Sequence, residues 1–497
     1  MFESAEIGHK LSKGEYKAIE PKLRTDLLEA QVKLSQRGDF PVIILISGVR
    51  GAGKGETVNL LNEWMDPRHI RTIAFDTPTD EERARPPMWR YWRALPPKGK
   101  IGILFGSWYT APIIDRVFKM SKKRDLAKSI ERIRQFEAML AQDGALIIKF
   151  WFHLSETAQK KRLKALQADP KTRWRVTDRD WSFFKHYRRF TDISGEVLEE
   201  TSTAHAPWLV VEGSDPEYRA VMVGKVLLEA MNKRLAMPKG EAAVKIATPP
   251  LVEPVDHLHT LDTLNLKQSV PKEKYEAEIA KLQARIGKLT RHPKFAERSI
   301  ICAFEGMDAA GKGGAIRRIA GSLDARLYNI IPVAAPTDEE RAQSYLWRFW
   351  RHLPGKGRIT IYDRSWYGRV LVERVEKFCS EADWMRAYGE INEFEEEIAE
   401  AGGIVTKFWL QISPEEQLRR FKEREKIKHK NFKITPEDWR NRDKWDAYQR
   451  AASDMIERTH TKHAPWVMVE ANDKYFARVK ILKELVERVE AQLEGRG

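Results

Sequence analysis

A short stretch in the second half of the chain has the residue types and the spacing to bind phosphate. The apolar run that begins at Ile301 stops at Gly306, and Gly311 and Lys312 come five residues later. In a loop with this spacing, glycines let backbone N–H groups converge on an anion, and the following helix adds its positive N-terminal end. The lysine supplies a charge that can follow a moving phosphoryl group. The stretch therefore predicts a phosphate-binding loop, the alternative being a glycine-rich turn.

The residues of this loop and of the first helical turn are the expected phosphate contacts. They are Gly306, Ala309, Ala310, Gly311, Gly313 and Gly314. Gly313 follows the lysine at the position where such loops normally carry the Ser or Thr that holds Mg²⁺. Asp308, inside the loop, is therefore the expected replacement as metal ligand.

A second carboxylate follows another apolar run, Arg358–Tyr362. Asp363 is placed to meet the same metal, the alternative being a helix cap. Arg364 comes next and Arg369 lies one turn further on, and both could bind phosphate through two N–H groups at once. For these two arginines the alternative is a surface ion pair.

Two further segments carry charges that could contact substrate. Residues 413–440 are rich in Lys and Arg, and Arg420 and Arg424 share a helix face. This segment could fold over the phosphates as a lid, although a charge run is often only a solvated face. In the second segment, residues 337–351, the candidates for holding a second substrate are Thr337, Asp338, Arg341 and Arg348. Its tryptophans are more typical of a core than of a stacking platform.

The composition limits the class of protein. A chain of 497 residues is too long for one core. Its net charge of +15 favours a polyanionic partner such as nucleic acid, acidic lipid or polyphosphate, although a merely basic protein stays an alternative. Two cysteines outside any metal-binding pattern favour a reducing, cytoplasmic location. We see no secretory signal and no apolar run long enough for a membrane span, and a homo-oligomer stays open.

The chain is a duplication. The loop residues Gly306, Gly311 and Lys312 have counterparts 258 positions earlier, at Gly48, Gly53 and Lys54. The same offset relates several other motifs. The repeated motifs are Pro78–Ala84 with Pro336–Ala342, Trp89-Arg90 with Trp347-Arg348, Ser107–Tyr109 with Ser365–Tyr367, Lys149–Trp151 with Lys407–Trp409, and His205–Trp208 with His463–Trp466. We therefore predict two domains, residues 1–237 and 272–497, joined by a proline-containing linker over 238–271 that is extended.

Each copy alternates short apolar runs with helical patterns, which predicts an α/β fold with a parallel sheet between helices and ligands at the carboxyl ends of the strands. In the second copy the strands are expected at 300–304, 328–333, 358–362, 404–412 and 466–470. The helices are expected at 314–323, 337–352, 368–378, 384–401, 414–430 and 436–460, with one more closing the chain. His463 recurs in both copies, which favours a structural role for it.

These motifs resemble the polyphosphate kinase 2 family. The resemblance is carried by Gly306–Gly314, Tyr362–Arg369, the basic segment and His463–Trp466, and the two-copy layout resembles the family's two-domain class, the polyphosphate:AMP phosphotransferases. It implies a P-loop fold similar to thymidylate kinase with a helical lid, dependence on Mg²⁺, and transfer of a phosphoryl group from inorganic polyphosphate to AMP. The family's centre then implies catalytic roles for Asp308, Lys312, Asp363 and Arg364, and polyphosphate contacts for Arg420 and Arg424. The second substrate held by residues 337–348 would be the nucleotide.

The first copy departs from this pattern where the metal would bind. Arg50 stands at the position of Asp308, and Phe105 and Gly106 stand at those of Asp363 and Arg364. We therefore expect the first copy to be inactive. Two other functions stay open: an ATP-dependent nucleoside monophosphate kinase, and a nucleic-acid-binding protein, although we recognise no nucleic-acid module and expect no specific nucleic-acid or membrane partner.

Overall fold

The computed structural model describes residues 2–240, 251, 258–427 and 436–495, and it divides the chain into two compact units. Unit 1 contains Met1–Pro78, Arg90–Ile246 and Thr337–Trp347, and unit 2 contains Thr79–Trp89, Ala247–Pro336 and Arg348–Gly497. Each unit therefore includes one short segment that comes from the other half of the sequence. The boundaries predicted from the sequence stay a prediction.

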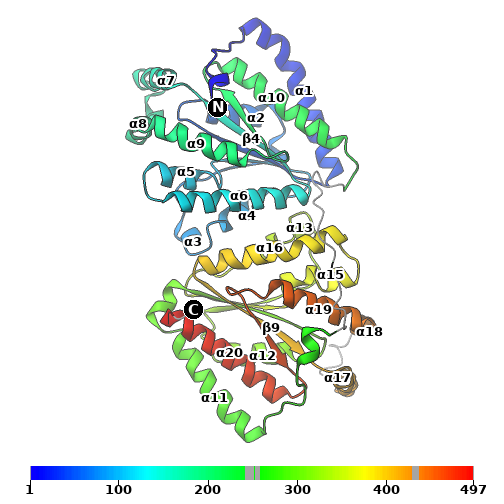
Figure 1. Ribbon diagram of the computed structural model, residues 1–497. Coiled ribbons are helices and arrows are strands. Elements are labelled where there is room, and N and C mark those ends of the chain that lie inside the picture. Colours follow the sequence, from blue (N-terminus) through cyan, green and yellow to red (C-terminus); the bar gives the residue numbers. More distant parts are fainter. Residues whose placement is uncertain (1, 241–250, 252–257, 428–435, 496–497) are drawn as a thin grey trace. The chain divides into compact units, whose positions relative to one another are not determined.

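Unit 1 is built on a parallel sheet of five strands in the order β2-β3-β1-β4-β5. The strands are β1 (Val42–Gly48), β2 (Ile70–Ala74), β3 (Ile101–Phe105), β4 (Leu146–His153) and β5 (Trp208–Glu212). The helices α1 (Lys13–Arg37), α2 (Lys54–Trp64) and α10 (Pro216–Leu235) pack together on one face, and α5 (Thr110–Val117), α6 (Lys123–Gln142) and α9 (Tyr187–Thr201) on the other (Figure 1). The remaining helices are α4 (Trp89–Ala94), α7 (Glu156–Ala168), α8 (Asp178–Lys185) and α13 (Asp338–Arg341).

Unit 2 repeats this architecture with the strand order β7-β8-β6-β9-β10, also parallel. Its strands are β6 (Ser299–Gly306), β7 (Tyr328–Pro332), β8 (Ile359–Asp363), β9 (Gly403–Gln411) and β10 (Trp466–Glu470). The helices α11 (Lys272–Leu289), α12 (Lys312–Ala320) and α20 (Lys474–Glu494) cover one face, and α16 (Glu381–Glu400) and α19 (Trp445–Thr459) lie over the other (Figure 1). The remaining helices are α3 (Asp80–Arg83), α14 (Trp347–Trp350), α15 (Val372–Val375), α17 (Pro414–Lys426) and α18 (Pro436–Asp443). The predicted α/β fold with two parallel sheets is confirmed.

The central strand of each sheet positions the phosphate loop. β6 is paired on both sides, by β8 and β9, and ends at Gly306. A Cβ at Gly306 would lie 2.5 Å from the carbonyl oxygen of Leu410, so only glycine lets the two strands approach this closely. The loop therefore leaves the sheet at its centre, at the carboxyl edge where parallel α/β sheets bind ligands.

A buried ion pair explains several of the repeated motifs. Lys407 Nζ donates to Glu395 Oε2 at 2.7 Å and to the hydroxyl of Tyr367 at 2.8 Å. Burial lowers the pKa of Lys407 and raises that of Glu395, and each group compensates the other's charge. Unit 1 repeats the arrangement, with Lys149 Nζ 2.7 Å from Glu137 Oε2. The Ser-Trp-Tyr and Lys-Phe-Trp motifs thus build the interior of both units.

Three helices predicted as continuous are divided. Residues 368–378 form the end of a 3₁₀ helix, Trp366–Arg369, and the short α15, while the predicted helix 414–430 ends as α17 at Lys426, with 428–430 outside the described residues. Residues 337–352 form α13 and α14 with a turn between them, and 436–460 form α18 and α19, which meet at Lys444. Lys444 has φ −104° and ψ 26°, outside the helical range. The predictions of single helices were wrong because a hydrophobic period continues across a break in the backbone, of five residues between α13 and α14 and of one residue at Lys444.

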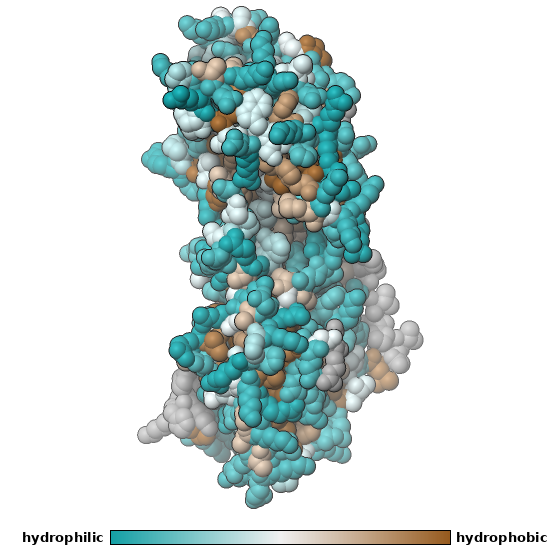
Figure 2. Space-filling model, turned by 90° about the vertical axis from the view of Figure 1, so that its left-hand side faces the viewer, coloured by the Kyte–Doolittle hydropathy of each residue, from teal (hydrophilic) through white to brown (hydrophobic). Residues whose placement is uncertain are grey.

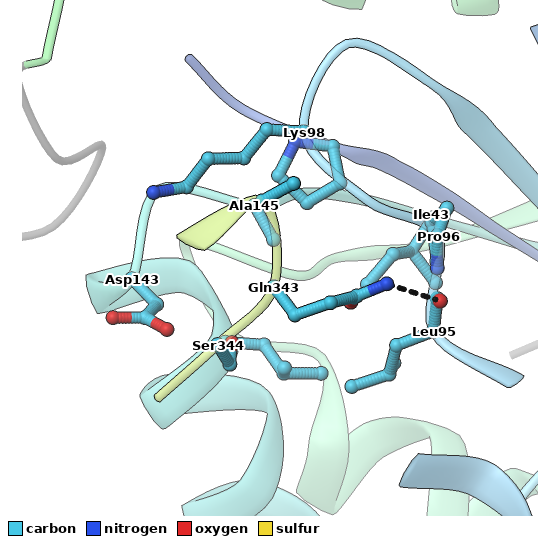
Figure 3. Close-up of a pocket in the computed structure, with 11 residues that line it drawn as sticks. Ile43, Leu95, Pro96, Lys98, Asp143, Ala145, Gln343 and Ser344 are labelled. Carbon is cyan, nitrogen blue, oxygen red and sulfur yellow. Dashed lines mark hydrogen bonds between the residues drawn. The ribbon is translucent and has the colours of Figure 1, made fainter. Parts of the chain in front are cut away.

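The segment Thr337–Trp347, which unit 1 takes from the second half of the sequence, contacts the residues that lead into strand β3. Gln343 Nε2 donates to the carbonyl of Leu95 at 3.4 Å, and the backbone N–H of Lys98 donates to the carbonyl of Ala342 at 2.8 Å. Figure 3 shows Gln343 and Ser344 beside Leu95 and Pro96 in a small cavity of this unit. In unit 2 the equivalent segment is held in the same manner, with Lys356 N–H donating to the carbonyl of Ala84 at 3.0 Å.

Hydrophilic residues dominate the face of the molecule in Figure 2, and hydrophobic ones are scattered in small groups. None of the described helices combines the length and the apolar character needed to cross a bilayer. Much of the predicted linker lies outside the described residues. Its described part includes a short 3₁₀ helix, Thr260–Thr263, whose Asp262 accepts a hydrogen bond from Gln449 of α19.

Candidate active site

Lys312 begins helix α12 and reaches back across the phosphate loop of unit 2. Its Nζ donates to the carbonyl oxygens of Gly306 at 2.7 Å and Met307 at 3.4 Å. Gly311, with φ 109°, makes the turn into the helix. The ammonium group, the loop and the N-terminal end of α12 therefore converge on one point, the arrangement that binds phosphate.

Two carboxylates lie at this point, as the sequence predicted. Asp308 Oδ1 accepts from Arg364 Nη2 at 3.1 Å, and Asp308 Oδ2 accepts from Asn441 Nδ2 of α18 at 2.8 Å. Asp363 ends strand β8, and its Oδ2 lies 3.9 Å from the position of a Cβ at Gly313. Asp308, Asp363, Arg364 and Lys312 are thus brought together at the end of the central strands.

The charges around Lys312 oppose the effect of its burial. Burial lowers the pKa of Lys312, and the carboxylates of Asp308, Asp363 and Glu305 act in the opposite direction. Arg364 adds to the lowering. The three carboxylates therefore stabilise the charged ammonium.

The sequence analysis missed Glu305, which lies in β6 directly before Gly306. Its side chain is buried, and its Oε1 accepts a hydrogen bond from Ser365 Oγ at 2.8 Å. Burial raises its pKa, while Lys312 and Arg364 lower it. A glutamate between the apolar run Ile300–Phe304 and Gly306 was the signal that could have identified it.

Asn441 and Arg478 were also missed. Asn441 belongs to α18 and donates to the loop aspartate. A Cβ at Gly314 would lie 3.3 Å from Arg478 Nη2 of α20, so this guanidinium flanks the first turn of α12. Neither residue belongs to a local motif, because each comes from a helix distant in sequence.

Two residues of the site have left-handed backbone conformations that are costly for anything but glycine. Ala309 has φ 62° and Arg364 has φ 64°. Such a conformation costs roughly 1–2 kcal/mol for a residue with a Cβ. Backbone strain of this kind is typical of functional sites that the surrounding structure holds in place.

A family model described as Polyphosphate kinase 2 (PPK2) matches residues 10–238 and 269–496. The chain belongs to the polyphosphate kinase 2 family. It is 54% identical over 491 residues to a polyphosphate:AMP phosphotransferase of Pseudomonas aeruginosa, with 99% of both chains covered. It is 52% identical over 490 residues to one from Pseudomonas syringae pv. tomato, covering 99% of this chain and 98% of the other. A crystal structure of a polyphosphate kinase 2 from Pseudomonas aeruginosa PA01 matches with a TM-score of 0.90, 52% identity and 99% of both chains.

The arginines expected to bind polyphosphate in this polyphosphate kinase 2 chain lie in different surroundings. Arg420 is buried, and each of its five N–H donors has an acceptor. The acceptors are Glu416 and the backbone carbonyls of Ala309, Ala310, Ala471 and Asn472. Arg420 therefore anchors the backbone of the loop through the carbonyls of Ala309 and Ala310, a structural contact that was not predicted from the sequence.

Arg424 and Arg369 differ from Arg420. Arg424 is partly exposed on α17. Arg369 lies 2.8 Å from Glu373 and is mostly covered. Phosphate contacts of all three arginines stay predictions.

The residues expected to hold the nucleotide do not gather at the loop within one unit. Thr337 caps α13 by accepting from the N–H of Glu340, and Asp338 pairs with Arg341. These belong to unit 1, whereas the loop and Arg348 belong to unit 2. Arg348 Nη2 donates to the carbonyl of Ala334 at 3.1 Å. Their role in nucleotide binding stays a prediction.

Proposed function

We propose that this chain transfers a phosphoryl group from inorganic polyphosphate to AMP, giving ADP and a chain shorter by one phosphate. The observation that carries the proposal is the convergence of Lys312, Arg364 and two aspartates on one loop. The near full-length match to relatives named polyphosphate:AMP phosphotransferase supports the choice of donor and acceptor.

Different residues of unit 2 would bind different parts of the reacting phosphates. Lys312 and the N-terminal end of α12 hold the phosphoryl group that moves. An oxygen of the AMP phosphate forms the new P–O bond, and the phosphoanhydride bond to the rest of the chain breaks. Arg364 is placed to bind the negative charge that spreads over the transferring group.

Mg²⁺ is the cofactor that the donor set fits. The described residues contain no group of three or more His, Cys, Asp or Glu side chains that could hold a metal alone. Two carboxylates are nevertheless what Mg²⁺ commonly takes from a protein, the remainder coming from water and substrate phosphates. Asp308 and Asp363 would hold the ion, which when bound neutralises charge on the phosphates.

The deciding experiment supplies purified protein with AMP, Mg²⁺ and polyphosphate in the absence of ATP. We expect ADP to form while the polyphosphate chain shortens. A parallel reaction replaces polyphosphate with ATP. Phosphorylation of AMP in that reaction alone would favour an ATP-dependent nucleoside monophosphate kinase and reject the proposal.

Domain boundaries and location complete the proposal. We place the inactive copy at residues 1–237 and the catalytic copy at 272–497, with 238–271 between them. The matched ranges of the family model support this division. The free thiols of Cys302 and Cys379 support a reducing, cytoplasmic location.

A further inference from the structure

Unit 1 contains a cavity of about 700 Å³ over its own copy of the loop. The cavity is lined by the loop glycines, by aromatic rings and by five cations. The cations are Arg50, Lys54, Arg162, Arg175 and Arg179. A volume of this size falls in the range of small-molecule sites and far exceeds a single phosphate.

Four of these cations already have acidic partners. Arg50 lies 2.9 Å from Asp180, Arg162 and Arg175 lie 2.9 and 3.5 Å from Glu56, and Arg179 lies 3.9 Å from Asp76.

Lys54 differs. In the described part of the chain its Nζ contacts only carbonyl oxygens, those of Gly48 at 2.8 Å and Val49 at 2.6 Å. Its charge is thus directed at the loop, and the nearby carboxylate of Asp180, which is paired with Arg50, compensates it only in part.

Trp151, beside the cavity, differs from its counterpart in unit 2. Its side chain is 1% exposed, it lines the same cavity, and its Nε1 has no hydrogen-bond partner among the described residues. The equivalent Trp409 of unit 2 donates to Gln411 Oε1 at 2.8 Å. Unit 1 has His153 in place of that glutamine, and His153 Nε2 contacts Glu6 instead.

The two aspartates proposed to hold the metal in unit 2 have no counterpart in this cavity, which is lined by Glu56, Asp76 and Asp180, each paired with an arginine. Arg50 and Phe105 stand where unit 2 has its two aspartates, so negative charge on a ligand would be met directly by cations and backbone N–H groups. We propose that unit 1 holds a metal-independent site for a ligand with two or more linked phosphates, an inorganic phosphate chain or a nucleoside diphosphate. This site is separate from the proposed reaction in unit 2 and is assigned by the geometry of unit 1 alone.

Gly55 offers a way to block the site without disturbing the fold. It lies in the first turn of α2 and lines the cavity, and a Cβ added there would meet no atom within 4 Å. Gly55→Glu therefore places a negative charge in the cavity, and Gly55→Gln is a neutral control of nearly the same size. Both are made in full-length protein that also carries Lys312→Ala, which weakens phosphate binding in unit 2.

The measurement is calorimetric titration in EDTA with tripolyphosphate, ADP or orthophosphate. We expect metal-free binding of tripolyphosphate or ADP in the Lys312→Ala protein, weakened at least about tenfold by Gly55→Glu and little changed by Gly55→Gln, since tenfold corresponds to only ~1.4 kcal/mol. Stronger binding of tripolyphosphate would identify an inorganic chain as the ligand, and stronger binding of ADP a nucleotide.

Three results would overturn the proposal. They are an absence of binding without metal, equal binding by Gly55→Glu and Gly55→Gln, and binding of orthophosphate alone. If Gly55→Glu failed to fold, as judged by circular dichroism, Lys54→Met would serve in its place, with the same loss of binding expected.

Discussion

The phosphate loops of the two units have the same backbone conformation, but a carboxylate in a polar network in unit 2 is replaced by an arginine over an aromatic ring in unit 1. In unit 2, Asp308 accepts from Asn441, whose Oδ1 accepts from Tyr448. In unit 1, Arg50 lies over the ring of Phe183 at 4.6 Å and pairs with Asp180. Three polar residues of the network around Asp308 have aromatic counterparts: Asn441 has Phe183, Tyr448 has Phe190, and Glu376, which accepts from Tyr448, has Phe118.

The interior shows no such divergence, since Lys149 and Lys407 make the same contacts at nearly the same distances. A buried ion pair cannot lose one member without a large loss of stability. Groups at the loop can be replaced once the chemistry is no longer needed. The comparison therefore separates residues that both units share in their interiors from residues that we propose to serve catalysis.

Backbone strain follows the same division. The positions of Ala309 and Arg364 are taken in unit 1 by Gly51 and Gly106, which have φ 79° and 77°. Glycine adopts these angles without a steric cost. The conformation is thus common to both units, and only the proposed catalytic copy holds it with residues that carry a Cβ.

The largest effect we expect is the same in both units. Lys407→Met and Lys149→Met each leave a buried glutamate without its partner and should lower the free energy of unfolding by about 3–5 kcal/mol. Chemical denaturation of the two variants measures this. A loss confined to one unit would contradict the view that the ion pair is a shared structural element.

Asp308→Asn in unit 2 should lower turnover far more than a matched substitution in unit 1. We expect turnover to fall about 10³-fold or more, because phosphoryl transfer would lose a group that holds its metal. The matched variant is Asp180→Asn, the carboxylate paired with Arg50 beside the unit 1 loop, for which we expect nearly unchanged turnover. Steady-state assays with polyphosphate and AMP compare them, and similar losses from both would mean that unit 1 takes part in the reaction.

The pH dependence of phosphate binding should sharpen the comparison further. Burial and the neighbouring Arg50 lower the pKa of Lys54 to about 7, against an opposing effect of Asp180. Because an anion favours the charged lysine, affinity for tripolyphosphate in EDTA should fall up to about tenfold between pH 6 and 8. Lys54→Arg keeps its charge over this range and serves as the control. An identical pH profile for both proteins would show that Lys54 does not titrate in binding.

The smallest effects concern the strained positions. Gly51→Ala should lower the free energy of unfolding by about 1 kcal/mol, because alanine at positive φ is strained. Ala309→Gly should raise it by up to about 1 kcal/mol, since part of the relief is offset by the entropy of glycine in the unfolded chain. Urea denaturation midpoints would show the two shifts, and shifts of equal sign would count against the strain argument.

The sequence predicted what depends on local pattern. The strands, the loop and the strand-end pair Asp363-Arg364 follow from apolar runs and fixed spacings, and the structure has them in place. Contacts such as Asn441 with Asp308 join residues 133 positions apart and leave no local trace. The break at Lys444 is a matter of one pair of backbone angles, which a hydrophobic period does not record.

In both units a guanidinium contacts the backbone carbonyl at the end of the last strand, but it comes from different helices. In unit 2, Arg420 of α17 donates to the carbonyl of Ala471, whereas in unit 1 Arg219 of α10 donates to the equivalent carbonyl of Gly213. Arg219 also reaches the loop so closely that its Cζ would lie 2.1 Å from a Cβ at Gly53. An alignment of the two copies pairs Arg219 with Ala477 and therefore records an unrelated substitution. Arg162 stands at the position of Arg420 but pairs with Glu56, so in unit 1 the guanidinium that contacts this carbonyl comes from a different helix.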